Sequence, residues 1–160
     1  MRHSIYSLLK SFGPLALAVC ALGTAPAQAA DTVETPVQSA ANPDYVAGRA
    51  AVDSKNWKGA IESLNKAAAR DAGNADVQTL LAYSYRHDGQ FKQAFDHYKE
   101  ALRLNPRHRG AHEYIGEAYL LTNDLPRAEE HLAALNKLCL FSCEEYTELK
   151  QSIEAYKRKR

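Results

Sequence analysis

A 34-residue periodicity is the feature that most constrains what this chain can fold into. Alanine recurs at that spacing at positions 60, 94 and 128, and a column of small residues, Gly48, Ala82 and Gly116, lies twelve residues before it. Large apolar residues keep the same register, as Trp57, Phe91 and Leu125 before each alanine and as Leu64, Tyr98 and Leu132 after it. A period in this range indicates one supersecondary unit that is repeated and stacked.

Each unit has the pattern of a helical hairpin. Small residues let two helices cross closely, and bulky residues at helical spacing fill the grooves beside them. Turn-forming triplets separate the two halves of each unit, at residues 54–56, 88–90 and 122–124. Pro106 closes the second unit, because proline disfavours a helical conformation in the residue before it. The sequence therefore predicts three hairpins, at residues 41–74, 75–108 and 109–142.

This pattern resembles the tetratricopeptide repeat. The family's small-residue, aromatic, alanine and terminal-proline positions are met in the second unit by Leu81, Ala82, Tyr85, Ala94, Tyr98 and Pro106. The first unit departs from it, with Ala51 in place of an aromatic residue and Ala72 in place of the proline, and the family's early tryptophan is absent from all three units. The resemblance covers residues 41–142 and implies an all-α, right-handed solenoid. Residues 143–158 carry apolar side chains at helical spacing and are predicted to form a C-terminal capping helix.

The first 29 residues have the composition of a secretory signal peptide. Basic residues precede an apolar run at 12–22, and Ala27-Gln28-Ala29 offers a cleavage site. The run is shorter than the roughly 20 residues that span a bilayer, so no membrane span is expected after cleavage. Cys20 could instead be the acylated cysteine of a lipoprotein, but Val19 stands where a small residue is expected. We therefore expect a periplasmic protein with a flexible linker at residues 30–41.

The mature chain would be almost neutral. Cleavage removes Arg2 and Lys10, which changes 20 basic against 19 acidic residues to 18 against 19. A balanced charge provides no general attraction to nucleic acid, so no nucleic-acid partner is expected. The basic residues around Arg107 and at positions 157–160 are interpreted as solvated ends of helices.

The resemblance also implies a binding groove, lined by the first helix of each repeat. Its residues would be Tyr45, Arg49, Val52, Thr79, Tyr83, Arg86, Glu113, Glu117 and Leu120. The aromatic rings could contact a peptide, the arginines could pair with its acidic groups and the glutamates with its basic groups. The alternative for any one of them is an ordinary solvated position. Tyr45 and Arg49 depart from the lysines and asparagines with which one subfamily grips chaperone carboxylates, so that ligand is not expected.

Cys139 and Cys143 are the two cysteines that remain after cleavage, and in an exported protein such a pair suggests a disulfide. A redox-active pair or half of a metal site are the alternatives, although no further ligands lie nearby in the sequence. His108 and His112 also have a spacing used by metal sites, but a helix start is expected between them. No metal site or cofactor is predicted.

The chain has no glycine-rich phosphate loop, no nucleophile elbow and no carboxylate pair set in a cleft. We therefore expect a non-enzymatic adaptor or scaffold of the cell envelope that binds a protein or peptide segment in its groove. Two alternatives remain open at this stage. One is a thiol-redox or metal-handling protein that uses Cys139 and Cys143, and the other is a homo-oligomer that pairs through an apolar edge of the first repeat.

Overall fold

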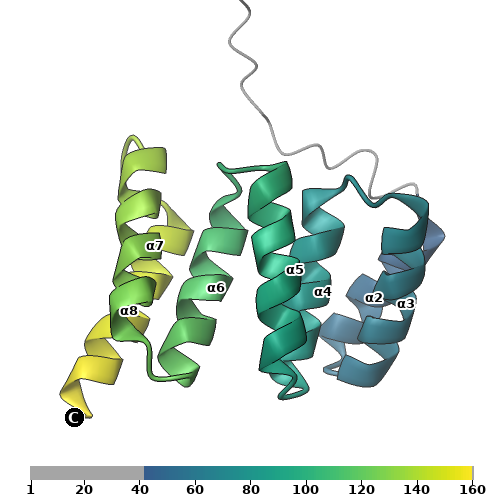
Figure 1. Cartoon of the computed structure of the whole chain (residues 1–160), viewed down its shortest axis with the longest axis horizontal. Helices are drawn as coiled ribbons and strands as arrows, with labels where there is room; N and C mark the ends of the chain where they lie inside the picture. The colour runs from purple at the N-terminus through teal and green to yellow at the C-terminus, as the bar shows by residue number, and fades with distance from the viewer. Residues whose placement is uncertain (1–41, 160) are drawn as a thin grey trace, which may run out of the picture. The chain divides into compact units, whose positions relative to one another are not determined.

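A computed structural model describes residues 42–159. The predicted signal peptide with Cys20 and the predicted linker lie outside these residues. The described part contains helices and no strand. The helices are α2 (Pro43–Asp53), α3 (Trp57–Arg70), α4 (Ala75–His87), α5 (Phe91–Leu104), α6 (Arg109–Leu121), α7 (Leu125–Leu138) and α8 (Glu144–Arg158) (Figure 1).

The helices pair as three successive hairpins, α2 with α3, α4 with α5 and α6 with α7. The turn inside each hairpin contains one residue with a positive φ at the same place in the repeat, 57° at Lys55, 79° at Gly89 and 63° at Asn123. Glycine adopts this left-handed conformation freely, and asparagine tolerates it better than most residues. The turn-forming triplets therefore reverse the chain in the same way in all three hairpins.

Polar side chains fix where the helices begin. Asn42 and Asn74 each accept two backbone hydrogen bonds from the first turns of α2 and α4, and Asn56 and Asp124 each accept one at the starts of α3 and α7. Such caps satisfy N–H groups that have no partner within the helix. The helix starts are thus encoded locally.

The two columns of small residues lie where helices meet. Ala60, Ala94 and Ala128 are fully buried. A Cβ added to Gly48 would lie 2.5 Å from the side chain of Leu64, and one added to Gly116 would lie 2.6 Å from that of Leu149. Small residues therefore let α2 approach α3 and let α6 approach α8.

Successive hairpins stack through their neighbouring helices. Helix α3 packs against α4, α5 packs against α6, and α8 covers the last hairpin by packing on both α6 and α7. Leu149 and Ile153 carry this last contact and join the same apolar cluster as Tyr98 and Ile115. The predicted all-α solenoid of three hairpins and a C-terminal helix is confirmed. No helix among residues 42–159 has the length and apolar character needed to cross a membrane.

Candidate functional site

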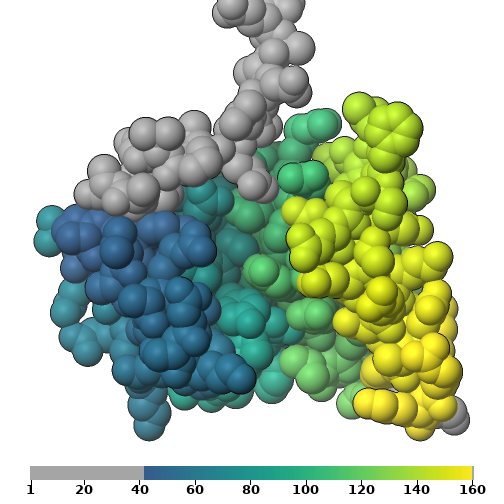
Figure 2. All heavy atoms as spheres, turned by 180° about the vertical axis from the view of Figure 1, so that it is seen from behind, coloured from purple at the N-terminus to yellow at the C-terminus, as the bar shows by residue number. Residues whose placement is uncertain are grey.

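Two pockets lie on the face formed by α2, α4, α6 and α8. Figure 2 shows this face, with α2 at one side, α8 at the other, and α4 and α6 between them. The first pocket has a volume of about 310 Å³ and lies between α2, α4 and the first half of α6. The second has a volume of about 320 Å³ and lies between the C-terminal ends of α4, α6 and α8.

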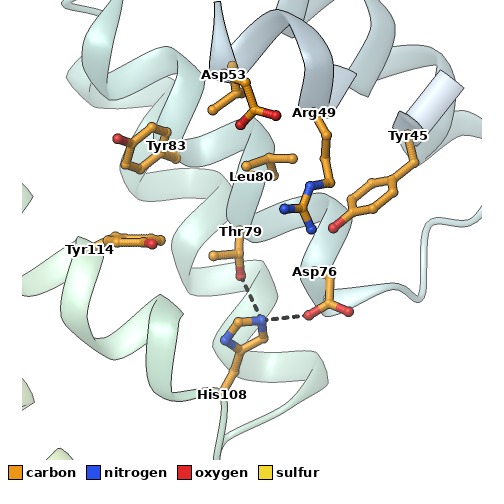
Figure 3. Close-up of a pocket in the computed structure, with 10 residues that line it drawn as sticks. Tyr45, Arg49, Asp53, Asp76, Thr79, Leu80, Tyr83, His108 and Tyr114 are labelled. Atoms are coloured by element: carbon orange, nitrogen blue, oxygen red, sulfur yellow. Dashed lines mark hydrogen bonds and ion pairs between the residues drawn. The ribbon is translucent and has the colours of Figure 1, made fainter. Parts of the chain in front are cut away.

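The first pocket combines aromatic rings with charged groups. Its lining residues are Tyr45, Arg49, Val52, Asp53, Asp76, Thr79, Leu80, Tyr83, His108 and Tyr114 (Figure 3). Residues of three successive repeats contribute to it, so the pocket exists only when the hairpins are stacked.

His108 ties the base of this pocket together. It is the N-cap of α6, and its Nδ1 accepts a 3.1 Å hydrogen bond from the backbone N–H of Ala111. The proton of the neutral ring must then be on Nε2. Nε2 lies 3.0 Å from Oδ1 of Asp76 and 3.3 Å from Oγ1 of Thr79 (Figure 3). These contacts join α4 to α6 at the base of the pocket.

Arg49 and Tyr45 form the wall that α2 contributes. The Arg49 guanidinium points toward the Tyr45 hydroxyl (Figure 3). Burial, with the nearby Asp76 carboxylate, raises the pKa of Tyr45, so the phenol keeps its proton. Tyr45 is buried, whereas Arg49 is exposed. Arg49 is therefore oriented by the pocket and still open to a ligand.

An aromatic cluster forms the opposite wall. The rings of Tyr83 and Tyr114 lie 5.0 Å apart, and Trp57 meets Tyr83 edge-on at 6.1 Å. The guanidinium carbon of Arg86 lies 5.0 Å from the Tyr83 ring centre and 5.8 Å from that of Tyr114. Burial also raises the pKa of Tyr114 to about 12. The wall presents two tyrosine rings to the pocket.

Arg86 differs from its predicted role. Its Nη1 donates a 2.7 Å hydrogen bond to Oε2 of Glu117, and the residue is only 8% exposed. The ion pair is internal, which corrects the expectation that Arg86 would pair with acidic groups of a ligand and Glu117 with basic ones. Both residues line the second pocket, together with Leu120, Leu121, Ser152, Ala155, Tyr156 and Lys159.

Glu113 is also a correction. It is 5% exposed and lines neither pocket, because α8 packs against this part of α6. Burial and the neighbouring carboxyl groups of Glu148, Glu117 and Glu145 raise the pKa of Glu113 to about 9. A protonated, covered carboxyl cannot attract a basic group of a ligand.

The structure thus divides the predicted groove. Tyr45, Arg49, Val52, Thr79 and Tyr83 line the first pocket, whereas Arg86, Glu117 and Leu120 line the second. Five residues of the first pocket were not predicted: Asp53, Asp76, Leu80, His108 and Tyr114. Helical spacing could have indicated Asp76, which lies three residues before Thr79 and so shares its face of α4.

The histidines and cysteines lie outside a shared site. His112 is turned away from His108, since its Nδ1 lies 2.9 Å from Nδ1 of His131 and its Nε2 lies 3.1 Å from the carbonyl oxygen of Pro106. Cys139 and Cys143 form a disulfide, with Cα atoms 5.8 Å apart, between the end of α7 and the start of α8. Within residues 42–159, no group of three or more His, Cys, Asp or Glu side chains is arranged to hold a metal ion.

Comparisons with known proteins agree with this architecture. Two tetratricopeptide-repeat models match the sequence, over residues 45–107 and 85–152. None of the curated proteins compared with the chain matches it.

Three solved structures illustrate the similarity of fold. SycD, a type III secretion translocator chaperone of Yersinia enterocolitica, is 18% identical with a TM-score of 0.66, over 72% of this chain and 82% of SycD. The TPR2B domain of yeast Sti1, in complex with pHsp70, is 16% identical with a TM-score of 0.67, over 73% and 95%. The Sgt2 TPR domain of Aspergillus fumigatus is 23% identical with a TM-score of 0.62, over 70% and 73%. At these identities the likeness concerns the fold alone.

Proposed function

The chain belongs to the tetratricopeptide-repeat family, and we propose that it is a non-enzymatic adaptor that binds a segment of a partner protein in the first pocket. This proposal rests on which of the pocket's polar groups contact one another and which remain exposed to a ligand. Asp76, Thr79 and His108 contact one another at its base. Arg49 and Asp53 are exposed, and the rings of Tyr83 and Tyr114 form one wall. The groups left for a ligand are therefore rings and exposed charges.

This set of groups suits an extended peptide with an apolar side chain next to a carboxylate. The apolar side chain would pack on Tyr83 and Tyr114, because tyrosine rings offer a large contact area with few rotamers to fix. The carboxylate would accept hydrogen bonds from Arg49, whose guanidinium points into the pocket beside the Tyr45 hydroxyl (Figure 3). Preorganisation of this kind reduces the entropy that binding costs.

The solved relatives support a protein ligand for this fold. The Sti1 domain is in complex with pHsp70, and SycD is a chaperone of translocators. Tyr45 and Arg49 give this chain its own pocket chemistry, so the proposal does not extend to the ligands of those proteins.

We place this function in the cell envelope, on the basis of the predicted signal peptide. Sequencing the N-terminus of the protein isolated from its native cells would test this. The expected first residue is Ala30, and recovery of an intact Met1 from the cytoplasmic fraction would contradict an exported adaptor.

Site-specific photocrosslinking tests the binding site directly. A benzophenone amino acid would replace Tyr83, crosslinks would form in the native cell, and mass spectrometry would name the partner. The matched control carries the same amino acid at Lys92 on α5, which is exposed and lines neither pocket. We expect a partner that is captured from position 83 and not from position 92.

Arg49→Ala in the position-83 background then tests the chemistry. Loss of one hydrogen-bonded charge pair should reduce the crosslink yield about tenfold, and Arg49→Lys should retain part of it. Equal capture from both positions, or a yield that does not respond to Arg49→Ala, would count against the first pocket. Arg86 is unsuitable for this experiment, because its removal would disturb the ion pair with Glu117.

A further inference from the structure

The most exposed large apolar side chains of the described residues lie together in one loop. Leu140 is 93% exposed and Phe141 is 88% exposed. They occupy the short segment between Cys139 and Cys143, and the disulfide closes this segment into what we call the apolar loop (residues 139–143). Two large apolar side chains that are adjacent and exposed to water favour contact with a partner. The covalently closed loop holds them together as one interaction surface.

An apolar recess lies at the other end of the same helix. The second pocket is lined by Leu120 and Leu121 of α6 and by Ala155 of α8, with the Arg86–Glu117 ion pair, Ser152, Tyr156 and Lys159 around them. Leu121 is 60% exposed. Its volume of about 320 Å³ is in the range of pockets that take large apolar groups. The apolar loop precedes α8, and the pocket lies beside its C-terminal half, about 20 Å away along the helix.

The two ends of α8 also carry opposite charges. Glu144 and Glu148 are exposed near its start, and Arg158 and Lys159 are exposed at its end. When a second copy of α8 lies antiparallel to the first, each acidic end faces a basic end. A parallel arrangement would place like charges together and would be repelled.

We propose that this protein forms a two-fold symmetric dimer in which the two α8 helices lie antiparallel and the apolar loop of each copy enters the second pocket of its partner. A two-fold axis near the middle of α8 brings both loops to both pockets at once, because loop and pocket flank the same helix at opposite ends. The same axis brings Glu144 of each copy close to Arg158 and Lys159 of the other. Such an interface is closed and uses the same surface twice. It is independent of the first pocket and of the proposed adaptor function.

A second copy fits the apolar loop better than a membrane does. Glu144 and Glu148 are exposed shortly after the loop, and their carboxylates disfavour approach to an anionic lipid surface. The interface also differs from the apolar edge of the first repeat that the sequence suggested. Val46 is the large exposed apolar residue of that repeat, at 51%.

The first test is sedimentation equilibrium of the mature protein with its disulfide intact. We expect the wild type to be dimeric at micromolar concentration. The double variant Leu140→Ser, Phe141→Ser should raise the dimer dissociation constant at least tenfold, and so should Leu121→Asp in the pocket. Val46→Ser, which removes another exposed apolar side chain far from α8, should leave the dissociation constant unchanged. Circular dichroism would verify that each variant retains its helices.

Charge reversal tests the antiparallel geometry. Glu144→Lys should weaken the dimer, because three bases then meet at each end of the interface, and Arg158→Glu, Lys159→Glu should weaken it because three acids then meet. An equimolar mixture of these two variants should recover a heterodimer, since each reversed end finds its complement. Recovery also demonstrates that both variants are folded.

Several results would overturn the dimer. A wild type that remains monomeric at 100 µM would do so, as would a dimer that resists both the loop and the pocket variants, or a mixture of charge variants that stays monomeric. Flotation with vesicles of phosphatidylethanolamine and phosphatidylglycerol tests whether the apolar loop binds a membrane instead. Monomers that bind these vesicles through Leu140 and Phe141 would replace the proposal with a membrane contact.

Discussion

Arg86 of α4 and Glu117 of α6 form a 2.7 Å ion pair, with the guanidinium buried beneath the rings of Tyr83 and Tyr114. The rings face the first pocket and the ion pair faces the second. This pair thus fixes the wall between the two pockets and holds the second repeat against the third.

Breaking this pair should destabilise the fold. Glu117→Gln keeps the shape of the side chain but leaves the buried Arg86 guanidinium without its anion. The Nε of Arg86 already has no hydrogen-bond partner. We expect a loss of about 3 kcal/mol in the free energy of unfolding, measured by urea denaturation. Glu100→Gln breaks an exposed pair with Arg103 and should leave the unfolding curve unchanged. A similar small effect from both substitutions would show that the buried pair has no structural weight.

The packing of α8 on α6 depends on Gly116. A Cβ at this position would lie 2.6 and 2.8 Å from the two Cδ atoms of Leu149. Gly116→Ala should therefore destabilise the protein by about 1–3 kcal/mol, despite alanine's better helix propensity. Gly110→Ala is the matched control, because its Cβ would meet His108 no closer than 3.6 Å. Thermal unfolding should show a lower midpoint for the first variant and an equal or higher midpoint for the second.

The repeat register could be predicted from sequence because it depends on spacing alone. Ala60, Ala94 and Ala128 share one environment, so a single period indicates all three. The groove was predicted less well, since its chemistry depends on which side chains face each other across helices. Nothing in the local sequence of Arg86 shows that Glu117, 31 residues later, will neutralise it.

The prediction for Glu113 was wrong because of the C-terminal helix. Its position in the repeat predicts a groove residue, but α8 packs against that part of α6 and buries the carboxyl. His108 was weighed as a metal ligand and is instead the cap of α6, because its ring accepts from the backbone of Ala111. In each case the deciding contact is made with another part of the fold, and residue spacing within one segment cannot predict such a contact.

Glu113 should make stability depend on pH. In the unfolded chain this carboxyl ionises near its ordinary pKa of 4.5, whereas in the fold it keeps its proton up to about 9. Its contribution to stability is therefore complete below pH 4.5 and is lost progressively as pH rises toward 9. Glu113→Gln copies the protonated form and should exceed the wild type in stability at pH 8, with a difference that shrinks toward pH 5. Urea denaturation of both proteins at several pH values measures this, and parallel pH profiles would contradict it.

The disulfide should be structural. Cys139 and Cys143 join the end of α7 to the start of α8 and line neither pocket. Closing so short a loop should contribute about 2 kcal/mol, so Cys139→Ser, Cys143→Ser should lower the free energy of unfolding by that amount. Thiol titration of the denatured, unreduced mature protein should find no free thiol. A stoichiometric pair of free thiols in protein taken directly from its native cells would favour the redox alternative instead.

Trp57 should report on the protonation of His87. It is the chain's single tryptophan, and its ring stacks on the His87 imidazole with centroids 4.4 Å apart. Burial and the nearby Arg86 lower the pKa of His87 from 6.5, so the ring is neutral at pH 7. A protonated imidazole accepts an electron from excited indole, and Trp57 fluorescence should therefore fall as pH drops, with a midpoint below 6.5. His87→Gln should abolish this transition while the helices remain intact by circular dichroism. A transition that survives the substitution would assign the quenching to another group.

Because Trp57 also meets Tyr83 of the first pocket, the same signal would respond to a ligand bound there.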